Sequence, residues 1–205
     1  MRWITKLVLC IAFPLLAGCG AISSLSKASE EFDAYTLSPA STAGPPVAGS
    51  RHLIVELPSS AGALGSDRIL IKPVPFQAQY LPDGRWSEPA PALVQTLLIA
   101  SFQNLGGFRL VGRIANGLNP DYTLMSELQE FQVEPLGVEP AGFVIKVGMM
   151  MTLIRESDRR IVASRRFAAS EAVGSDDTPQ LVVGFDRALR KVLGQAVVWT
   201  QAQGG

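Results

Sequence analysis

The segment FVIKVGMMMTL, residues 143–153, carries the clearest structural pattern in the chain. Its apolar side chains recur at every second position, at Phe143, Ile145, Val147, Met149, Met151 and Leu153. A period of two is that of a β-strand, because successive side chains of a strand point to opposite faces. The pattern predicts a strand with one face in a hydrophobic core. It places Met149 and Met151 in that core and Met150 on the opposite face.

The neighbouring segments extend this strand into a sheet. The turn at residues 156–159 leads to a hairpin partner at residues 160–173, where apolar and polar side chains again alternate. Residues 121–133 form a long extended segment with imperfect alternation, which predicts a β-bulge. Further strands are expected at residues 32–37, 52–57, 68–72, 108–111 and, as an edge strand before a turn at Pro82-Asp83-Gly84, at 76–80.

Two segments show helical spacing instead. In residues 88–105, Leu93 and Leu97 begin an apolar stripe; we expect Ser87 to cap this helix and Gly106-Gly107 to end it. A second helix begins after Asp177-Thr178-Pro179 and carries a stripe formed by Val182, Phe185, Leu189, Val192, Ala196 and Trp199.

Strands in runs, with only two helices between them, predict an α+β domain. We expect two layers, in which a mixed, mostly antiparallel sheet carries both helices on one face. If the strands at 68–72 and 108–111 are parallel neighbours, the first helix forms a right-handed crossover between them. Residues 39–50 (PASTAGPPVAGS) predict a flexible or polyproline-like loop with little to hold it down.

The N-terminus predicts a lipoprotein signal. Residues 1–18 combine Arg2 and Lys6 with a short apolar run, and LAGC at residues 16–19 resembles a bacterial lipobox. Cys19 is then the acylated mature N-terminus, with palmitate among the expected acyl groups. Residues 19–31 form a polar tether and residues 32–205 the folded domain. The alternative is a conventional signal peptide that leaves Cys19 as a free thiol.

Composition excludes several function classes. Eighteen basic and eighteen acidic residues give no net charge, which argues against nucleic acid as a partner. Two cysteines and one histidine are too few for a structural zinc site, so we expect neither a bound metal nor a cofactor. The sequence has no Walker loop and no G-x-S-x-G elbow, and His52 lies in an alternating strand where a surface or cross-strand role is commoner than catalysis. We therefore predict no enzymatic activity.

One group of basic residues is a candidate binding site for an acidic partner or anionic lipid headgroups. It gathers around the hairpin turn and comprises Arg155, Arg159, Arg160, Arg165 and Arg166. The alternative is a solvated hairpin in which Glu156 and Asp158 pair with these arginines.

Four short motifs occur in a fixed order along the chain. They are Tyr35-Thr36-Leu37, Asp67-Arg68-Ile69, Tyr80 with Arg85-Trp86-Ser87-Glu88-Pro89, and Asp121-Tyr122-Thr123-Leu124. Together with the lipobox, they resemble the ABC-type transport auxiliary lipoprotein family, which includes the PqiC-like proteins. The resemblance covers nearly all of the mature chain. The insertion at residues 39–50 departs from the family pattern.

The resemblance implies a non-enzymatic accessory of an MCE-type, ABC-linked lipid transport system. In that role an outer-membrane lipoprotein docks onto a periplasm-spanning partner, and its partners are an MCE-domain protein and an ABC permease and ATPase. Gly20, after Cys19, resembles the outer-membrane sorting signal of enterobacterial lipoproteins. Anchoring in the inner membrane is the alternative. Phospholipid and a second copy of the chain are further candidate partners. The alternatives are a periplasmic lipid-binding carrier, an outer-membrane assembly lipoprotein and a hydrolase.

Overall fold

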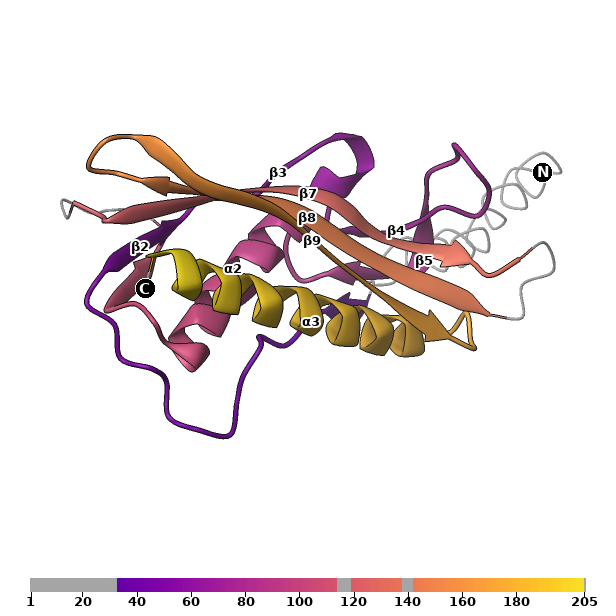
Figure 1. Cartoon of the computed structure of the whole chain (residues 1–205). Coiled ribbons are helices and arrows are strands. Elements are labelled where there is room, and N and C mark those ends of the chain that lie inside the picture. Colours follow the sequence, from indigo (N-terminus) through magenta and orange to yellow (C-terminus); the bar gives the residue numbers. More distant parts are fainter. Residues whose placement is uncertain (1–32, 114–118, 138–141, 205) are drawn as a thin grey trace, which may run out of the picture. The chain divides into compact units, whose positions relative to one another are not determined.

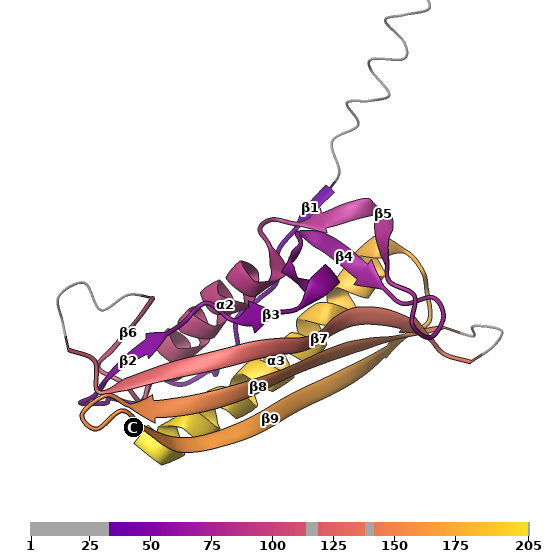
Figure 2. The ribbon, with the colours of Figure 1, turned by 90° about the horizontal axis from the view of Figure 1, so that it is seen from above.

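The computed structural model describes residues 33–113, 119–137 and 142–204. The chain divides into Met1–Phe32 and Asp33–Gly205, and the described residues all belong to the second unit. They form a mixed sheet of nine strands and two α-helices, both on the same face of the sheet (Figures 1 and 2). The predicted α+β class is confirmed.

The elements follow one another in a simple order. In chain order they are β1 (Asp33–Tyr35), β2 (His52–Val55), β3 (Ser59–Ser60), the 3-10 helix η1 (Gly62–Gly65), β4 (Arg68–Ile71), β5 (Gln79–Trp86), α2 (Ala90–Leu105), β6 (Leu110–Gly112), β7 (Tyr122–Pro135), β8 (Phe143–Arg155), β9 (Arg160–Val173) and α3 (Thr178–Gly204).

Strand β7 is the centre of the sheet. Along one edge it pairs with β8 in an antiparallel ladder that runs from Tyr122 to Pro135. Along the other edge it pairs, in turn, with β2, β3 and β4, and all three short ladders are parallel. Three short strands that are close to one another in sequence, but distant from β7, are therefore aligned along its edge.

The antiparallel part of the sheet agrees with the sequence pattern. The β7–β8 and β8–β9 ladders each contain thirteen register pairs, whereas the other ladders contain two or three. A register shift between Leu128 and Glu130 confirms the predicted bulge in β7. Met149 and Met151 are fully buried while Met150 is only partly buried, as the alternation predicts.

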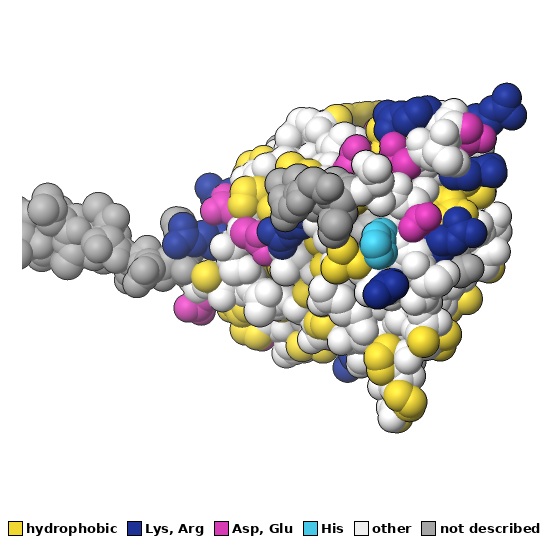
Figure 3. All heavy atoms as spheres, turned by 90° about the vertical axis from the view of Figure 1, so that its left-hand side faces the viewer, with side chains coloured by type: hydrophobic (Ala, Val, Ile, Leu, Met, Phe, Trp, Pro, Cys, Tyr) yellow, Lys and Arg dark blue, Asp and Glu magenta, His cyan; other side chains and the backbone are white. Residues whose placement is uncertain are grey.

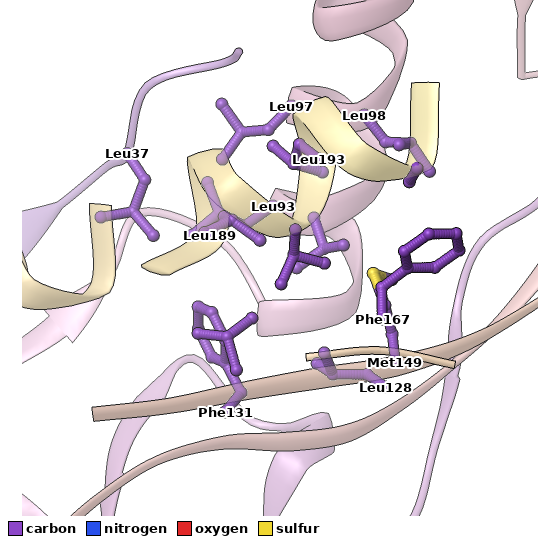
Figure 4. Packing of buried hydrophobic residues seen from close by; sticks show 14 of the residues in the cluster. Leu37, Leu93, Leu97, Leu98, Leu128, Phe131, Met149, Phe167, Leu189 and Leu193 are labelled. Carbon is purple, nitrogen blue, oxygen red and sulfur yellow. The ribbon is translucent and has the colours of Figure 1, made fainter. Parts of the chain in front are cut away.

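The core fills the space between the helices and the sheet. Leu93, Leu97 and Leu98 of α2 and Leu189 and Leu193 of α3 are all buried in this core. Figure 4 shows them facing side chains of the sheet, among them Leu128, Phe131, Met149 and Phe167. Close packing of this kind leaves little room between the layers.

The predicted turn at Pro82-Asp83-Gly84 is wrong. These residues lie within β5, which continues to Trp86 and pairs there with β1. The stretch of β5 from Gln79 to Arg85 contains more residues than the stretch of β4 from Arg68 to Ile71 with which it pairs. The Pro-Asp-Gly sequence therefore forms an irregularity inside a strand, where a missing proline N–H is tolerated. The strand predicted at residues 76–80 begins only at Gln79.

The predicted helix cap at Ser87 is also wrong. The helix α2 begins at Ala90, its N-cap is Pro89, and no side chain caps it. The backbone N–H of Ser87 instead donates to the carbonyl of Tyr35, 2.7 Å away. This bond continues the pairing of β5 with β1 past Trp86, so α2 begins later in the sequence than predicted.

The loop at residues 39–50 is held more firmly than its composition predicts. The N–H of Ala40 donates to the Ser101 hydroxyl over 2.9 Å, and Val47 exchanges backbone bonds with Leu105 and Gly107. Gly106, at φ 80°, makes this contact possible because a Cβ there would lie 2.1 Å from the Val47 carbonyl oxygen. Gly106 also ends α2, as predicted.

The expected crossover between the strands at 68–72 and 108–111 is not formed. β6 pairs in parallel with β2, while β4 pairs in parallel with β7. The chain therefore passes through α2 and returns beside β2. The periodicity of short strands does not specify which strand will be a neighbour.

Trp86 provides a test of the core. It is 1% exposed, and its ring centroid lies 5.3 Å from that of Phe131 and 5.1 Å from that of Phe185, so it joins β5, β7 and α3. Trp86→Ala is expected to lower the free energy of unfolding by about 3–5 kcal/mol, measured by urea denaturation. Phe76→Ala, at a fully exposed ring, is the matched control and should change it little. Equal losses in both variants would contradict this assignment of the core.

Candidate functional site at the hairpin end

The β8–β9 hairpin lies at one end of the sheet, and β2 and β6 begin beside it. Tyr122, the first residue of β7, pairs with Arg155, the last residue of β8. The backbone N–H of Glu156 donates to the Asp121 carbonyl over 2.9 Å, and that of Arg109 donates to the Arg51 carbonyl over 2.8 Å. We call this the hairpin-end surface; it comprises Arg51, Arg109, Asp121, Arg155, Glu156, Ser157, Asp158, Arg159 and Arg160.

Arginines outnumber carboxylates on the hairpin-end surface. Figure 3 views this end, and basic side chains are prominent on it. Its five arginines face three carboxylates, on Asp121, Glu156 and Asp158. A net positive surface of this kind attracts acidic groups, most strongly at low ionic strength.

Several arginines are paired within the surface. Arg51 lies 3.8 Å from Asp121, Arg155 lies 3.6 Å from Asp158, and Arg159 lies 2.5 Å from Glu156. Among the described residues, the side chain of Arg160 has no ion pair. These pairs are largely exposed, so each contributes little to stability. Their guanidinium groups stay accessible to a partner.

A hollow of about 420 Å³ opens on this surface. Arg51 and Arg155 line it, together with Asn119, Asp121 and Ser157. Arg51 also stacks over the ring of Tyr122, 5.9 Å from its centroid, which fixes the direction of its long side chain. The hollow thus offers guanidinium, amide and hydroxyl donors beside the carboxylates of Asp121 and Glu156, so it is polar and carries charges of both signs.

Two of the five candidate arginines lie elsewhere. Arg166 lies on the sheet face away from the helices and pairs with Glu130, with a further bond of 3.2 Å to Gln129. Gly148 allows this arrangement, since a Cβ there would lie 2.5 Å from a carboxylate oxygen of Glu130. Arg165 lies over the ring of Phe167, 5.2 Å from its centroid. The structure therefore groups Arg155, Arg159 and Arg160 and separates Arg165 and Arg166 from them.

Sequence reasoning missed Arg51 and Arg109. They precede β2 and β6 and join the site only because both strands run parallel to β7. No periodicity in the sequence indicates that pairing.

His52 shows no catalytic arrangement. It begins β2 and is partly exposed, and its backbone N–H donates to a carboxylate oxygen of Asp121 over 2.8 Å. This bond is made by the backbone, so the predicted surface or cross-strand role of the imidazole remains a prediction. Across residues 33–113, 119–137 and 142–204, no group of three or more His, Cys, Asp or Glu is placed to hold a metal ion. Cys19 lies outside the described residues, and its acylation remains a prediction.

Two carboxylates are held in their ionised form. The pKa of Glu156 is lowered, chiefly by a hydrogen bond from the Thr123 hydroxyl; partial burial opposes this effect, and the hydrogen bond and charge of Arg159 add to the lowering. Partial burial raises the pKa of Glu134, but hydrogen bonds from Lys146 and Gln132 outweigh it and the net shift is downward. The Lys146 Nζ lies 2.6 Å from Glu134 on the outer face of the sheet.

Comparison with known proteins agrees with this architecture. The model of the family described as "ABC-type transport auxiliary lipoprotein component" matches residues 35–197. The chain belongs to this family. The match includes the hairpin-end surface, all of α2 and most of α3, and it confirms the family indicated by the sequence motifs.

Individual relatives show how far the likeness extends. The crystal structure of protein XCC0632 from Xanthomonas campestris has a TM-score of 0.72 and 27% identity, covering 84% of this chain and 94% of that one. The crystal structure of an uncharacterized protein, at TM-score 0.57 and 18% identity, covers 84% of this chain and 95% of that one and shares the fold. The uncharacterized protein bll6063 of Bradyrhizobium diazoefficiens is 26% identical over 154 residues, or 74% of this chain. That match spans only 40% of the Bradyrhizobium protein.

Among the described helices, none has the length and apolar character needed to cross a membrane. The family is described as a lipoprotein component, and Cys19 is the predicted acylation site in this chain.

The Thr123–Glu156 hydrogen bond predicts a pH dependence. Because the pKa of Glu156 is lowered by folding, its stabilisation is present above the unfolded pKa of about 4.5 and is lost as pH falls through the folded pKa. Thr123→Val removes the donor and should cost about 1–2 kcal/mol at pH 7. The difference between wild type and variant in urea unfolding should shrink in acid. A difference that is the same at neutral and acid pH would contradict this role.

Proposed function

We propose that this chain is a non-enzymatic accessory lipoprotein of an ABC-linked, MCE-type lipid transport system, and that the hairpin-end surface docks onto the periplasmic partner. The family supports the transport role, and the resemblance of the sequence to PqiC-like proteins supports the MCE partner. The single observation that carries the docking surface is its position at the end of the sheet remote from where the chain enters the fold.

The strand directions define that position. β1 pairs in parallel with β5, which is antiparallel to β4, and β4 is parallel to β7. The chain therefore enters β1, at Asp33, from the end of the sheet opposite to the hairpin. β4 pairs with β7 at Gln132. Gln132 is ten residues, or about 33 Å along the strand, from Tyr122 at the hairpin end of β7. A tether from Cys19 thus attaches to the domain on the side away from Arg155, Arg159 and Arg160.

This geometry favours a protein partner over lipid headgroups for these arginines. The chain enters the fold at the opposite end of the sheet, so the hairpin end is the part of the domain farther from the point of attachment. A basic, exposed surface there is complementary to an acidic surface on a partner. We propose attachment to the outer membrane, on the basis of Gly20, and docking across the periplasm from that side.

The packing of the core supports an adapter rather than a carrier. A carrier must enclose an acyl chain in an apolar cavity. Here the space between sheet and helices is filled by side chains, and Trp86, Phe102, Phe131 and Phe185 are all less than 2% exposed. Phospholipid is accordingly proposed as the cargo of the system, not as a ligand stored in this core.

The test is crosslinking in cells of the full-length protein, followed by detergent extraction, affinity purification and mass spectrometry. We expect an MCE-domain protein and ABC permease and ATPase subunits among the crosslinked partners. Arg159→Gln combined with Arg160→Gln should reduce their recovery severalfold. Arg187→Gln combined with Arg190→Gln, which neutralises two exposed arginines of α3, is the matched control and should leave it unchanged.

Three outcomes oppose the proposal in different ways. Recovery of porin or lipopolysaccharide machinery in place of transport subunits would indicate an outer-membrane assembly role. Recovery of bound lipid without protein partners would indicate a carrier. Equal loss of transport subunits in both double variants would show that the hairpin-end surface is not the docking site.

A further inference from the structure

The end of the sheet opposite to the hairpin exposes apolar side chains. Phe76 is fully exposed, Val74 is 53% exposed, and Leu136, just after β7, is 42% exposed. Phe76 and Val74 belong to the connection between β4 and β5, in which Pro73 and Pro75 flank Val74. We call residues 73–76 and Leu136 the apolar tip.

The backbone of the apolar tip is shaped by a tight turn. Gln77 donates its N–H to the Val74 carbonyl over 3.2 Å, Pro75 occupies the second position, and Phe76, in the third, has a φ of 67°. These are the features of a type II turn, whose third position favours glycine. A phenylalanine there is strained and gains no burial in return. Among the described residues, none covers this ring.

A hollow of about 640 Å³ adjoins the turn. It is lined by Pro73, Val74, Pro75 and Phe76 on one side and by Pro135 near the end of β7 on the other. Lys72 and Glu134 complete its lining and give it a polar margin. Exposed apolar side chains such as Phe beside charged groups are found in segments that lie at a membrane–water interface.

Chain connectivity identifies the bilayer as the occupant. Asp33, at the start of β1, pairs with Gly84 of β5. The neighbouring Arg85 pairs with Arg68 of β4, and Gln79, at the start of β5, pairs with Ile71. The distance along β4 from Arg68 to Ile71 is about 10 Å. The apolar tip begins just beyond that point. Cys19 is 14 residues before Asp33, so an acyl anchor there lies within about 46 Å of the start of β1. The chain thus enters the fold from the end that carries the apolar tip.

We propose that the apolar tip inserts into the phospholipid surface that holds the acyl anchor, with Phe76 as the deepest side chain. This second contact fixes the orientation of the domain, which a flexible tether alone does not. The inference rests on the predicted acylation of Cys19 and on the family, but it does not depend on which protein the hairpin end binds.

The test places a tryptophan at Phe76 in the full-length, acylated protein. Phe76→Trp is reconstituted into vesicles of phosphatidylethanolamine and phosphatidylglycerol, with and without brominated acyl chains, which quench tryptophan on contact. Ile161→Trp is the matched control, because Ile161 is 66% exposed on β9 at the hairpin end. Trp86 and Trp199 are buried and give a common background, which the parent protein measures.

We expect emission from the tryptophan at position 76 to shift to shorter wavelength and to be quenched severalfold more than that from position 161. Equal quenching at the two positions would overturn the proposal. A shift to shorter wavelength without quenching by brominated lipid would also overturn it, because the tip would then contact protein. Each result leaves the crosslinking test of the transport partners unaffected, so the two proposals fail separately.

Discussion

Hydrogen bonding along both edges of β7 is the constraint on which the rest of the structure depends. An unpaired backbone group in a buried strand is costly, so every section of β7 requires a neighbour. β8 supplies one edge over the full length, and β2, β3 and β4 share the other. Because β2 runs parallel to β7 from its first residues, Arg51 lies at the hairpin end; because β4 runs parallel to β7 near its last residues, the connection after β4 reaches the other end.

The two ends of the sheet consequently differ in chemistry. At the start of β7 the surface carries five arginines and a polar hollow. Beyond its last residue, the β4–β5 connection exposes Phe76 and Val74. The chain enters β1 from this second end. This polarity matches the proposed role, in which one end of the domain contacts lipid and the other an acidic protein surface.

Much of the fold was predictable because it depends on local patterns. The alternation from Phe143 to Leu153 identifies β8 and its buried face, and the broken alternation before it identifies the bulge in β7. The errors arose where distant segments decide the outcome. Ser87 is drawn into the sheet by Tyr35, and residues 39–50 are held by bonds to the end of α2. Local sequence contains neither contact.

The candidate site divides in the same way. Arg155, Arg159 and Arg160 surround one turn, so sequence proximity groups them correctly. Arg165 and Arg166 are adjacent in sequence but point to opposite faces of β9, and each has a different partner. Arg51 and Arg109 were not predictable, since parallel strand pairing brings them to the hairpin. The exposure of Phe76 depends on a positive φ, which a proline-rich sequence does not reveal.

Energy transfer from the protein to the membrane surface tests the polarity of the molecule most directly. In the acylated protein, the domain after Cys19 contains no other cysteine, so single labels can be introduced at Gln77→Cys and at Ser157→Cys. The two positions flank opposite ends of β7, which is about 44 Å long. With an acceptor dye on the lipid headgroups of reconstituted vesicles, we predict strong transfer from position 77 and weak transfer from position 157. Equal or reversed efficiencies would contradict the account.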